Sequence, residues 1–229
     1  PMRAGHSTIA KLLLVCAAAA SWPLSAAEIA LVLPNSFRAY LLDAAGSHEL
    51  VPEWTTQARI HLHAAMVDIV ERDPQFKAAS MPALSDEQRA VLEEHVALFE
   101  ANAQAAIEMI RVAGVAHKKH ERAYSLGSGL AFLAAAGIDK AVLVSGSQTW
   151  STRGRVLSRV LPGALGRHIA PAGASGLLIG YIDTTSGDIT WMHAMHPVRG
   201  GDVRDAGGAV RVLDKLVAQY PDGLIYAQH

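Results

Sequence analysis

Histidine offers most of the candidate site chemistry in this chain, because several of its 11 histidines stand close together. Imidazole nitrogens bind zinc well, and a zinc site needs three or four ligands at about 2.0–2.3 Å from the ion. His117 and His120 would share one face of a helix, and a fold could bring His193 and His196 to them. These four residues are the candidate metal ligands. The alternative is a set of surface imidazoles, since the two lysines within the first pair would repel a cation.

Two other polar motifs are weaker. Gly127, Ser128 and Gly129 precede a helix, whose first amides could bind a phosphate. They lack the lysine of a P-loop and the third glycine of a dinucleotide fingerprint, so we expect Ser128 to cap that helix. Ser175 follows a Gly-Ala step and misses the Gly-x-Ser-x-Gly nucleophile elbow by one residue. The sequence therefore predicts no cofactor and no catalytic residue, although a hydrolase stays open.

The most informative polar feature is a segment without acidic residues between Lys140 and Ile182. It combines basic and apolar side chains, which suits contact with anionic lipid headgroups or an acidic protein, with Trp150 as anchor. The alternative is an amphipathic loop that packs its apolar side on its own sheet. The predicted contact residues are Trp150, Arg153, Arg155, Arg159 and Arg167.

The composition restricts the class of protein. The chain has 229 residues, of which 51% are hydrophobic and 18% charged, with a formal net charge of −1. Such an apolar fraction can form a packed core, which excludes disorder and coiled coil. A charge near zero gives no reason to expect nucleic acid as a partner. The single cysteine excludes a disulfide scaffold and the cysteine-rich zinc domains.

The first 27 residues have the pattern of a signal peptide, which we predict for 1–27. Two basic residues frame a short polar start, and the apolar run at 12–20 is too short to span a bilayer, which needs roughly 20 residues. Ser25 and Ala27 then provide small residues three and one before a cleavage site, so the mature chain would begin at Glu28. The alternative is an amino-terminal anchor that stays in place.

Export would change the chemistry of the mature chain. Cys16 would be lost with the signal, unless it is the site of lipidation, which its bulky neighbour Val15 disfavours. The mature chain would then have 18 basic and 21 acidic side chains and a net charge of −3. We expect a periplasmic or secreted protein with no membrane-spanning helix after signal cleavage.

The remaining residues, 28–229, are predicted to form one α/β domain. Apolar runs predict strands at 28–34, 76–79 and 140–145, and a hairpin at 177–183 and 188–193. Three-to-four periodicity predicts helices at 52–73, 86–113 and 202–220, with a short helix that ends at Gly137. Ser85 and Gln88 have the spacing of a capping box at the start of the longest helix. This order predicts a mixed sheet flanked by helices, with a carboxy-terminal hairpin followed by a helix.

Four segments carry a resemblance to known domains. The hairpin at 181–191, with its Asp-turn-Gly centre and closing Trp191, resembles the end of CsgG-like and TolB-amino-terminal-like envelope domains. The helix-to-strand step at 137–144 is similar to theirs. Exported proteins of uncharacterised function share the motifs at 125–127 and 201–204. The resemblance implies envelope assembly or secretion through protein contacts.

This chain departs from the resembled family in two respects, the long helix at 86–113 and the absence of a convincing lipobox. In the curli-secretion family, insertions near the basic segment enter the outer membrane, but here Pro162 and several glycines argue against an uninterrupted spanning element. The sequence thus predicts an exported, non-enzymatic interaction module of the bacterial envelope. A periplasmic metal-binding protein or metal-dependent hydrolase is the alternative, and assembly into a homo-oligomer stays open.

Overall fold

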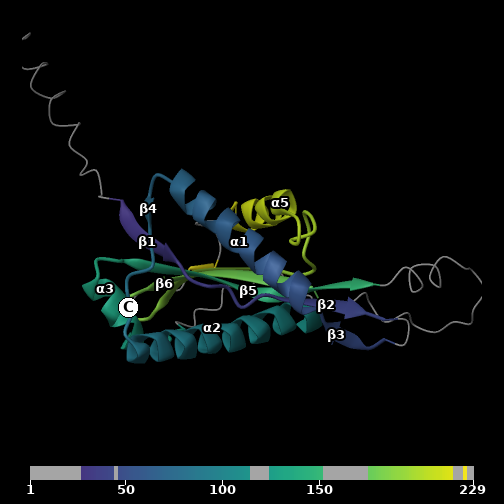
Figure 1. Cartoon of the computed structure of the whole chain (residues 1–229), viewed down its shortest axis with the longest axis horizontal. Helices are drawn as coiled ribbons and strands as arrows, with labels where there is room; N and C mark the ends of the chain where they lie inside the picture. Colours follow the sequence, from purple (N-terminus) through teal and green to yellow (C-terminus); the bar gives the residue numbers. More distant parts are fainter. Residues whose placement is uncertain (1–26, 44–45, 114–123, 152–174, 219–223, 226–229) are drawn as a thin grey trace, which may run out of the picture.

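A mixed sheet of eight strands organises the residues that the computed structural model describes, which are 27–43, 46–113, 124–151, 175–218 and 224–225. Helices lie on both faces of this sheet (Figure 1). The predicted class is therefore confirmed, including the hairpin followed by a helix. The strands are β1 (Glu28–Val32), β2 (Arg38–Leu42), β3 (His48–Leu50), β4 (Phe76–Ala79), β5 (Lys140–Ser151), β6 (Gly176–Asp183), β7 (Ile189–Met195) and β8 (Leu224–Ile225). The helices are α1 (Pro52–Arg72), α2 (Asp86–Ala113), the single turn η1 (Ser128–Leu130), α3 (Ala131–Ala135) and α5 (Ala206–Val217).

Strand β5 is the longest strand of the sheet and lies at its centre. Along one edge it pairs in parallel with β1 near Lys140 and then with β2, from Ser147 to Ser151. Along the other edge it pairs with antiparallel β6. β4 extends the sheet beyond β1, β3 extends it beyond β2, and β7 and β8 follow β6. The predicted strand ended at Ser145; it continues to Ser151, where β2 provides partners for the last five residues.

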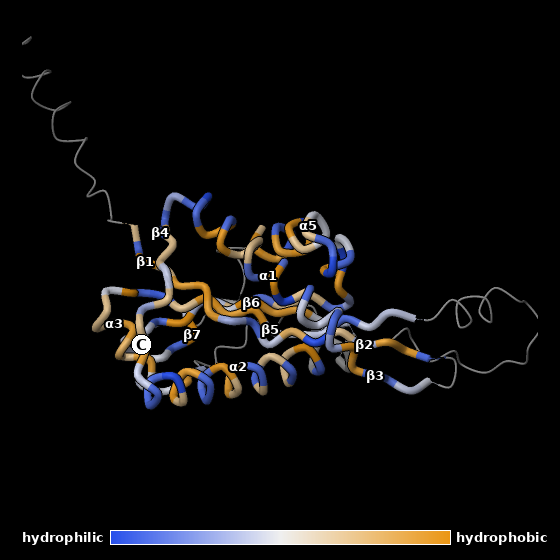
Figure 2. Tube along the Cα trace, viewed as in Figure 1, coloured by the Kyte–Doolittle hydropathy of each residue, from blue (hydrophilic) through white to orange (hydrophobic). Residues whose placement is uncertain are grey.

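Two helical layers cover the sheet. α1 and α5 pack on one face over a core that includes Leu62, Met66 and Leu213, while α2 and α3 cover the other face around Phe99 and Leu133. In Figure 2 the central strands are largely apolar, whereas the helices alternate between apolar and hydrophilic residues. This is the amphipathic pattern that the sequence periodicity predicted.

Helix α2 starts at the predicted capping box and lies very close to the sheet. The Gln88 amide donates to Ser85 Oγ at 3.1 Å, and the Ser85 amide donates to Gln88 Oε1 at 2.9 Å. Further along, the Phe99 ring lies over Gly180 of β6, where an added Cβ would stand 2.5 Å from the ring. The absent side chain therefore allows the helix to approach the strand.

Several elements differ from the prediction. β2, β3 and β8 were not expected, and α5 begins at Ala206, four residues later than predicted, with Asp205 as its N-cap. The prediction that Ser128 caps the following helix was wrong, because the N-cap is Gly127 and Ser128 is already the first residue of η1. Ser125 Oγ instead accepts from the Gly127 amide at 3.1 Å. No helix in the described part of the chain is long and apolar enough to span a membrane.

Gly180→Ala is expected to lower the free energy of unfolding by about 1–3 kcal/mol, because the new methyl group overlaps the Phe99 ring. In a Phe99→Leu background the same substitution should lower the free energy of unfolding by less, since leucine lacks the ring atoms that the methyl group would meet. Urea unfolding of the parent, the two single variants and the double variant measures both decreases. Equal decreases in the two backgrounds would contradict the close contact.

Candidate functional site

Trp150 is the predicted contact residue that the structure describes, and it lies near the carboxyl end of β5. Arg153, Arg155, Arg159 and Arg167 lie outside the described residues. Trp150 is half-buried and packs on the core beneath α1. The structure therefore shows what surrounds this end of the predicted contact segment.

Two tryptophans and an arginine meet at this point. The indoles of Trp54, from α1, and Trp150 pack edge to face, with ring centroids 5.8 Å apart and planes at 76°. The guanidinium carbon of Arg204 lies 4.3 Å from the Trp54 ring centroid and 4.2 Å from that of Trp150. A cation so close to two aromatic faces is attracted by both ring quadrupoles, each worth about 0.5–2 kcal/mol.

Asp202 completes this group, which we name the Trp–Arg cluster: Trp54, Trp150, Asp202 and Arg204. Arg204 Nε donates to both Asp202 carboxylate oxygens, at 2.9 and 3.0 Å. Burial by itself raises the pKa of Asp202, but hydrogen bonds and charge from Arg204, with a hydrogen bond from Trp150, bring the net pKa below its ordinary value. The carboxylate therefore stays ionised and holds Arg204 over the rings.

Gln148, which lies on β5 close to the Trp–Arg cluster, holds the connection between β7 and α5. The Gln148 side chain donates to the Gly201 carbonyl at 3.4 Å and accepts from the Val203 amide at 3.5 Å. Val203 is fully buried. This connection thus docks on the carboxyl end of β5 before α5 begins.

The residues before and after 152–174 lie beside one another. The Thr149 amide donates to Ser175 Oγ at 3.0 Å, and Ser147 pairs with Gly176 across β5 and β6. The Ser175 hydroxyl therefore has a structural role, because it accepts a hydrogen bond that joins β5 to the start of β6. The arginine-rich segment leaves and re-enters the described fold at the same end of the sheet.

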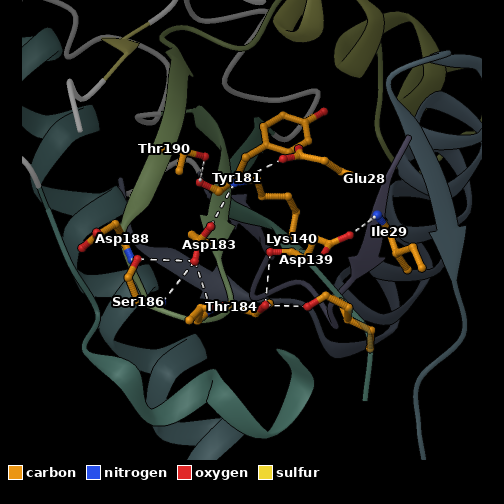
Figure 3. A network of polar contacts seen from close by, with 12 residues as sticks. Glu28, Ile29, Asp139, Lys140, Tyr181, Asp183, Thr184, Ser186, Asp188 and Thr190 are labelled. Carbon is orange, nitrogen blue, oxygen red and sulfur yellow. Dashed lines mark hydrogen bonds and ion pairs between the residues drawn. The ribbon is translucent and has the colours of Figure 1, made fainter. Parts of the chain in front are cut away.

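A second polar network lies at the opposite end of β5 (Figure 3). Lys140 has a side chain only 11% exposed, and its ammonium lies 3.2 Å from Asp183 and 3.8 Å from Glu28. Thr184 is fully buried and its hydroxyl donates to the Ile138 carbonyl. These contacts join β1, β5 and the turn of the β6–β7 hairpin.

The Asp183 carboxylate also organises that turn. Its Oδ1 accepts from the amides of Thr185 and Ser186 at 3.0 and 3.1 Å. Burial raises the pKa of Asp183. The Ser186 amide, the Lys140 ammonium and the Thr185 amide together lower this pKa by more, so the net pKa is below the ordinary value. All these partners are fixed parts of the fold, which gives Asp183 a structural role rather than a catalytic one.

The predicted metal ligands are only partly described. His193 lies on β7 and stacks on Trp191 with ring centroids 6.2 Å apart, and His196 follows the end of β7. His117 and His120 lie outside the described residues. Among the residues that are described, no three His, Cys, Asp or Glu side chains are arranged to hold a metal ion. The four-histidine site stays a prediction.

Sequence reasoning missed the partners of Trp150. Trp54 falls within the helix predicted at 52–73, and Asp202 and Arg204 lie in the motif at 201–204. Their spacing, Asp-x-Arg, permits the bidentate contact. Nothing local indicates that this pair meets two tryptophans from distant elements.

Comparison with known proteins yields a distant structural likeness. No protein-family model matches this chain, and no curated protein does either. Among solved structures, the chain is similar to lipoprotein GNA1162 from Neisseria meningitidis. The identity is 11% and the TM-score 0.29, over 86% of this chain and 99% of that one. A likeness at this level carries no argument, and the resemblance to CsgG-like and TolB-like domains stays a prediction.

Asp183→Asn is expected to lower the free energy of unfolding at neutral pH by about 2 kcal/mol, because Lys140 loses a charged partner. The lowered pKa of Asp183 stabilises the fold above the pKa of the unfolded chain, and this contribution is lost as the pH falls through the folded value. Urea unfolding at several pH values should therefore show the parent and the variant converging in acid. A difference that stays constant down to about pH 2 would contradict the ionised role of Asp183.

Arg204→Lys is expected to destabilise the protein by about 1–3 kcal/mol, since lysine keeps the charge but loses the planar fork and the stacking on two indoles. Tryptophan emission should change as well, because two of the four tryptophans lose this neighbour. Arg199→Lys is the matched control, because Arg199 lies on the same connection outside the Trp–Arg cluster. Equal stability and emission in the two variants would contradict the role assigned to Arg204.

Proposed function

We propose that this chain is an exported, non-enzymatic protein of the bacterial envelope that contacts an anionic membrane surface or an acidic envelope protein. The contact residues are Arg153, Arg155, Arg159 and Arg167, with Trp150 at the start of their segment. The observation that supports this proposal is the position of both flanks of 152–174 at one end of the sheet, beside the Trp–Arg cluster.

The charge balance at this end favours the segment itself as the basic element. Arg204 is paired with Asp202, and Arg38 of β2 is paired with Glu100 at 2.7 Å. The segment 152–174 contains four arginines and no acidic residue. Each arginine near an anionic surface contributes about 1 kcal/mol, so four would raise affinity by about a thousandfold at moderate salt.

The Trp–Arg cluster changes the role that we assign to Trp150. Its indole is already held by Trp54 and Arg204. A residue fixed in this way needs little further ordering when a partner binds. We therefore propose that Trp150 positions the start of the segment and that the arginines make the contact.

The test is sedimentation of the exported protein with vesicles of phosphatidylglycerol and phosphatidylethanolamine, compared with neutral phosphatidylcholine. Arg153→Glu with Arg155→Glu should weaken binding to the anionic vesicles by at least about thirtyfold, because two attractive charges become repulsive. Binding by the parent protein should also fall as salt rises, since added ions screen the attraction. The melting temperature should not change.

Lys77→Glu with Arg89→Glu is the matched control, because both side chains are exposed and neither lies near the ends of 152–174. This pair makes the same change in net charge and should bind nearly as well as the parent. If both double variants lost the same amount of vesicle binding, net charge alone would explain the binding, and this result would contradict the proposed site. A third outcome is that the parent binds neither type of vesicle but captures an envelope protein. If Arg153→Glu with Arg155→Glu then fails to capture it, the partner is that envelope protein.

A further inference from the structure

One edge of the Arg204 guanidinium is open, although the Trp–Arg cluster fixes the rest of the group. Nε donates to both carboxylate oxygens of Asp202, and Nη2 donates to Oδ2. Nη1 has no acceptor among the residues that the structure describes, and it is not one of their buried unpaired atoms, so solvent reaches it. The edge between Nη1 and Nη2 therefore still has two N–H groups that can donate to a ligand.

The two indoles do not enclose the guanidinium between them. Its central carbon lies 4.3 Å from the Trp54 ring centroid and 4.2 Å from that of Trp150, and these two centroids are 5.8 Å apart. Rings on opposite faces of the group would be farther apart, so both rings lie toward one side of it. The Arg204 side chain keeps 24% of its surface exposed. The guanidinium is thus fixed in place and still accessible.

This arrangement suits the recognition of an oxyanion. The two outer N–H groups at one edge of a guanidinium are parallel and match two oxygens of a carboxylate or a phosphate. A mobile arginine side chain loses rotamer freedom when it binds, whereas Arg204 is already held by both indoles and by Asp202. Its hydrogen bonds to a ligand therefore require little further ordering of the side chain.

We infer that the open edge of Arg204 binds the phosphate group of a phosphate monoester, and that Asp202 is a built-in competitor that lowers the affinity. Asp202 offsets one positive charge beside the site. A ligand on the open edge lies nearer to Arg204 than to Asp202, so its net attraction grows with its own charge. A phosphate monoester carries about −1.5 to −2 charges at pH 7, against one for a carboxylate. The site therefore favours phosphate over carboxylate.

The first experiment is titration of the full-length protein with inorganic phosphate at constant ionic strength, followed by calorimetry and by tryptophan emission. Asp202→Asn keeps the shape of the side chain and removes its negative charge, so this variant should bind phosphate at least about tenfold more tightly than the parent. Loss of structure cannot produce such a gain. Equal affinities, or no saturable binding by Asp202→Asn, would overturn the inference.

Asp205→Asn is the matched control, because it makes the same change in net charge on the same connection. Asparagine is also a good N-cap, so α5 should keep its start. This variant should bind phosphate within about threefold of the parent. If Asp205→Asn gained as much affinity as Asp202→Asn, net charge would explain both gains, and the assigned role of Asp202 would be wrong.

A second comparison tests the guanidinium itself. Asp202→Asn with Arg204→Lys has the same net charge as Asp202→Asn but lacks the two parallel N–H donors, so the gain in phosphate affinity should disappear. An unchanged gain would overturn the assignment to Arg204. If the double variant does not fold, the comparison of Asp202→Asn with Asp205→Asn still decides the inference.

Two further ligands identify the class and the source of the phosphate group. Acetate should bind Asp202→Asn more weakly than inorganic phosphate does, and equal or tighter binding of acetate would overturn the phosphate class. Vesicles of phosphatidylcholine with phosphatidic acid present the same monoester on a lipid. A gain by Asp202→Asn for inorganic phosphate and for these vesicles supports the inference with a lipid source, and a gain for inorganic phosphate alone supports it with a soluble source.

This inference goes beyond the proposed function and does not rest on it, because its site consists only of the Trp–Arg cluster. Arg153→Glu with Arg155→Glu should therefore keep the phosphate affinity of the parent. The two ideas can fail separately. Weakened binding of this double variant to phosphatidylglycerol vesicles, with no gain in phosphate affinity in Asp202→Asn, would support the proposed function and overturn the inference.

Discussion

The double pairing of β5 is the constraint on which the rest of the structure depends. One edge of this strand accepts β1 along its first residues and β2 along its last ones, so β1 and β2 must follow one another end to end. The short connection between them is held by Ser36, whose hydroxyl donates to Ser145, and by Asn35, which donates to the Arg59 carbonyl of α1. Thr55 then accepts from the Ala39 amide, which fixes the start of α1 over β2. This arrangement therefore fixes α1 on its face of the sheet.

The two ends of β5 differ in chemistry. At its start, the largely buried Lys140 side chain pairs with Asp183 and Glu28 and so joins the β6–β7 turn to β1. About 33 Å further along the strand, Trp150 joins the Trp–Arg cluster, which is only half-buried. The first end has its polar groups committed to the fold, whereas the second adjoins the arginine-rich segment. This contrast is why we place the interaction surface at the carboxyl end of β5.

Much of the fold could be predicted, because the relevant signals are local. The capping box at Ser85, the apolar runs and the turn residues of the hairpin each appear within a few positions of one another. β2 and the second half of β5 could not be predicted, because neither segment has the apolar pattern of a strand. They form strands by pairing with each other. Of the Trp–Arg cluster, Trp150 is the residue that the sequence singles out, and its role in contact stays a prediction. Trp150 and Arg204 are 54 positions apart in the sequence, and no local sequence pattern predicts their contact.

The most direct test of the account is to ask which end of β5 approaches the anionic surface. An environment-sensitive fluorophore would be attached at Ser151→Cys, at the carboxyl end of β5, and in a second protein at Thr185→Cys, in the exposed turn at the opposite end, both with Cys16 replaced by serine. With phosphatidylglycerol vesicles, the emission at position 151 should shift to the blue while that at position 185 stays unchanged. A blue shift at position 185 alone, or equal shifts at both positions, would contradict a contact made through the arginine-rich end.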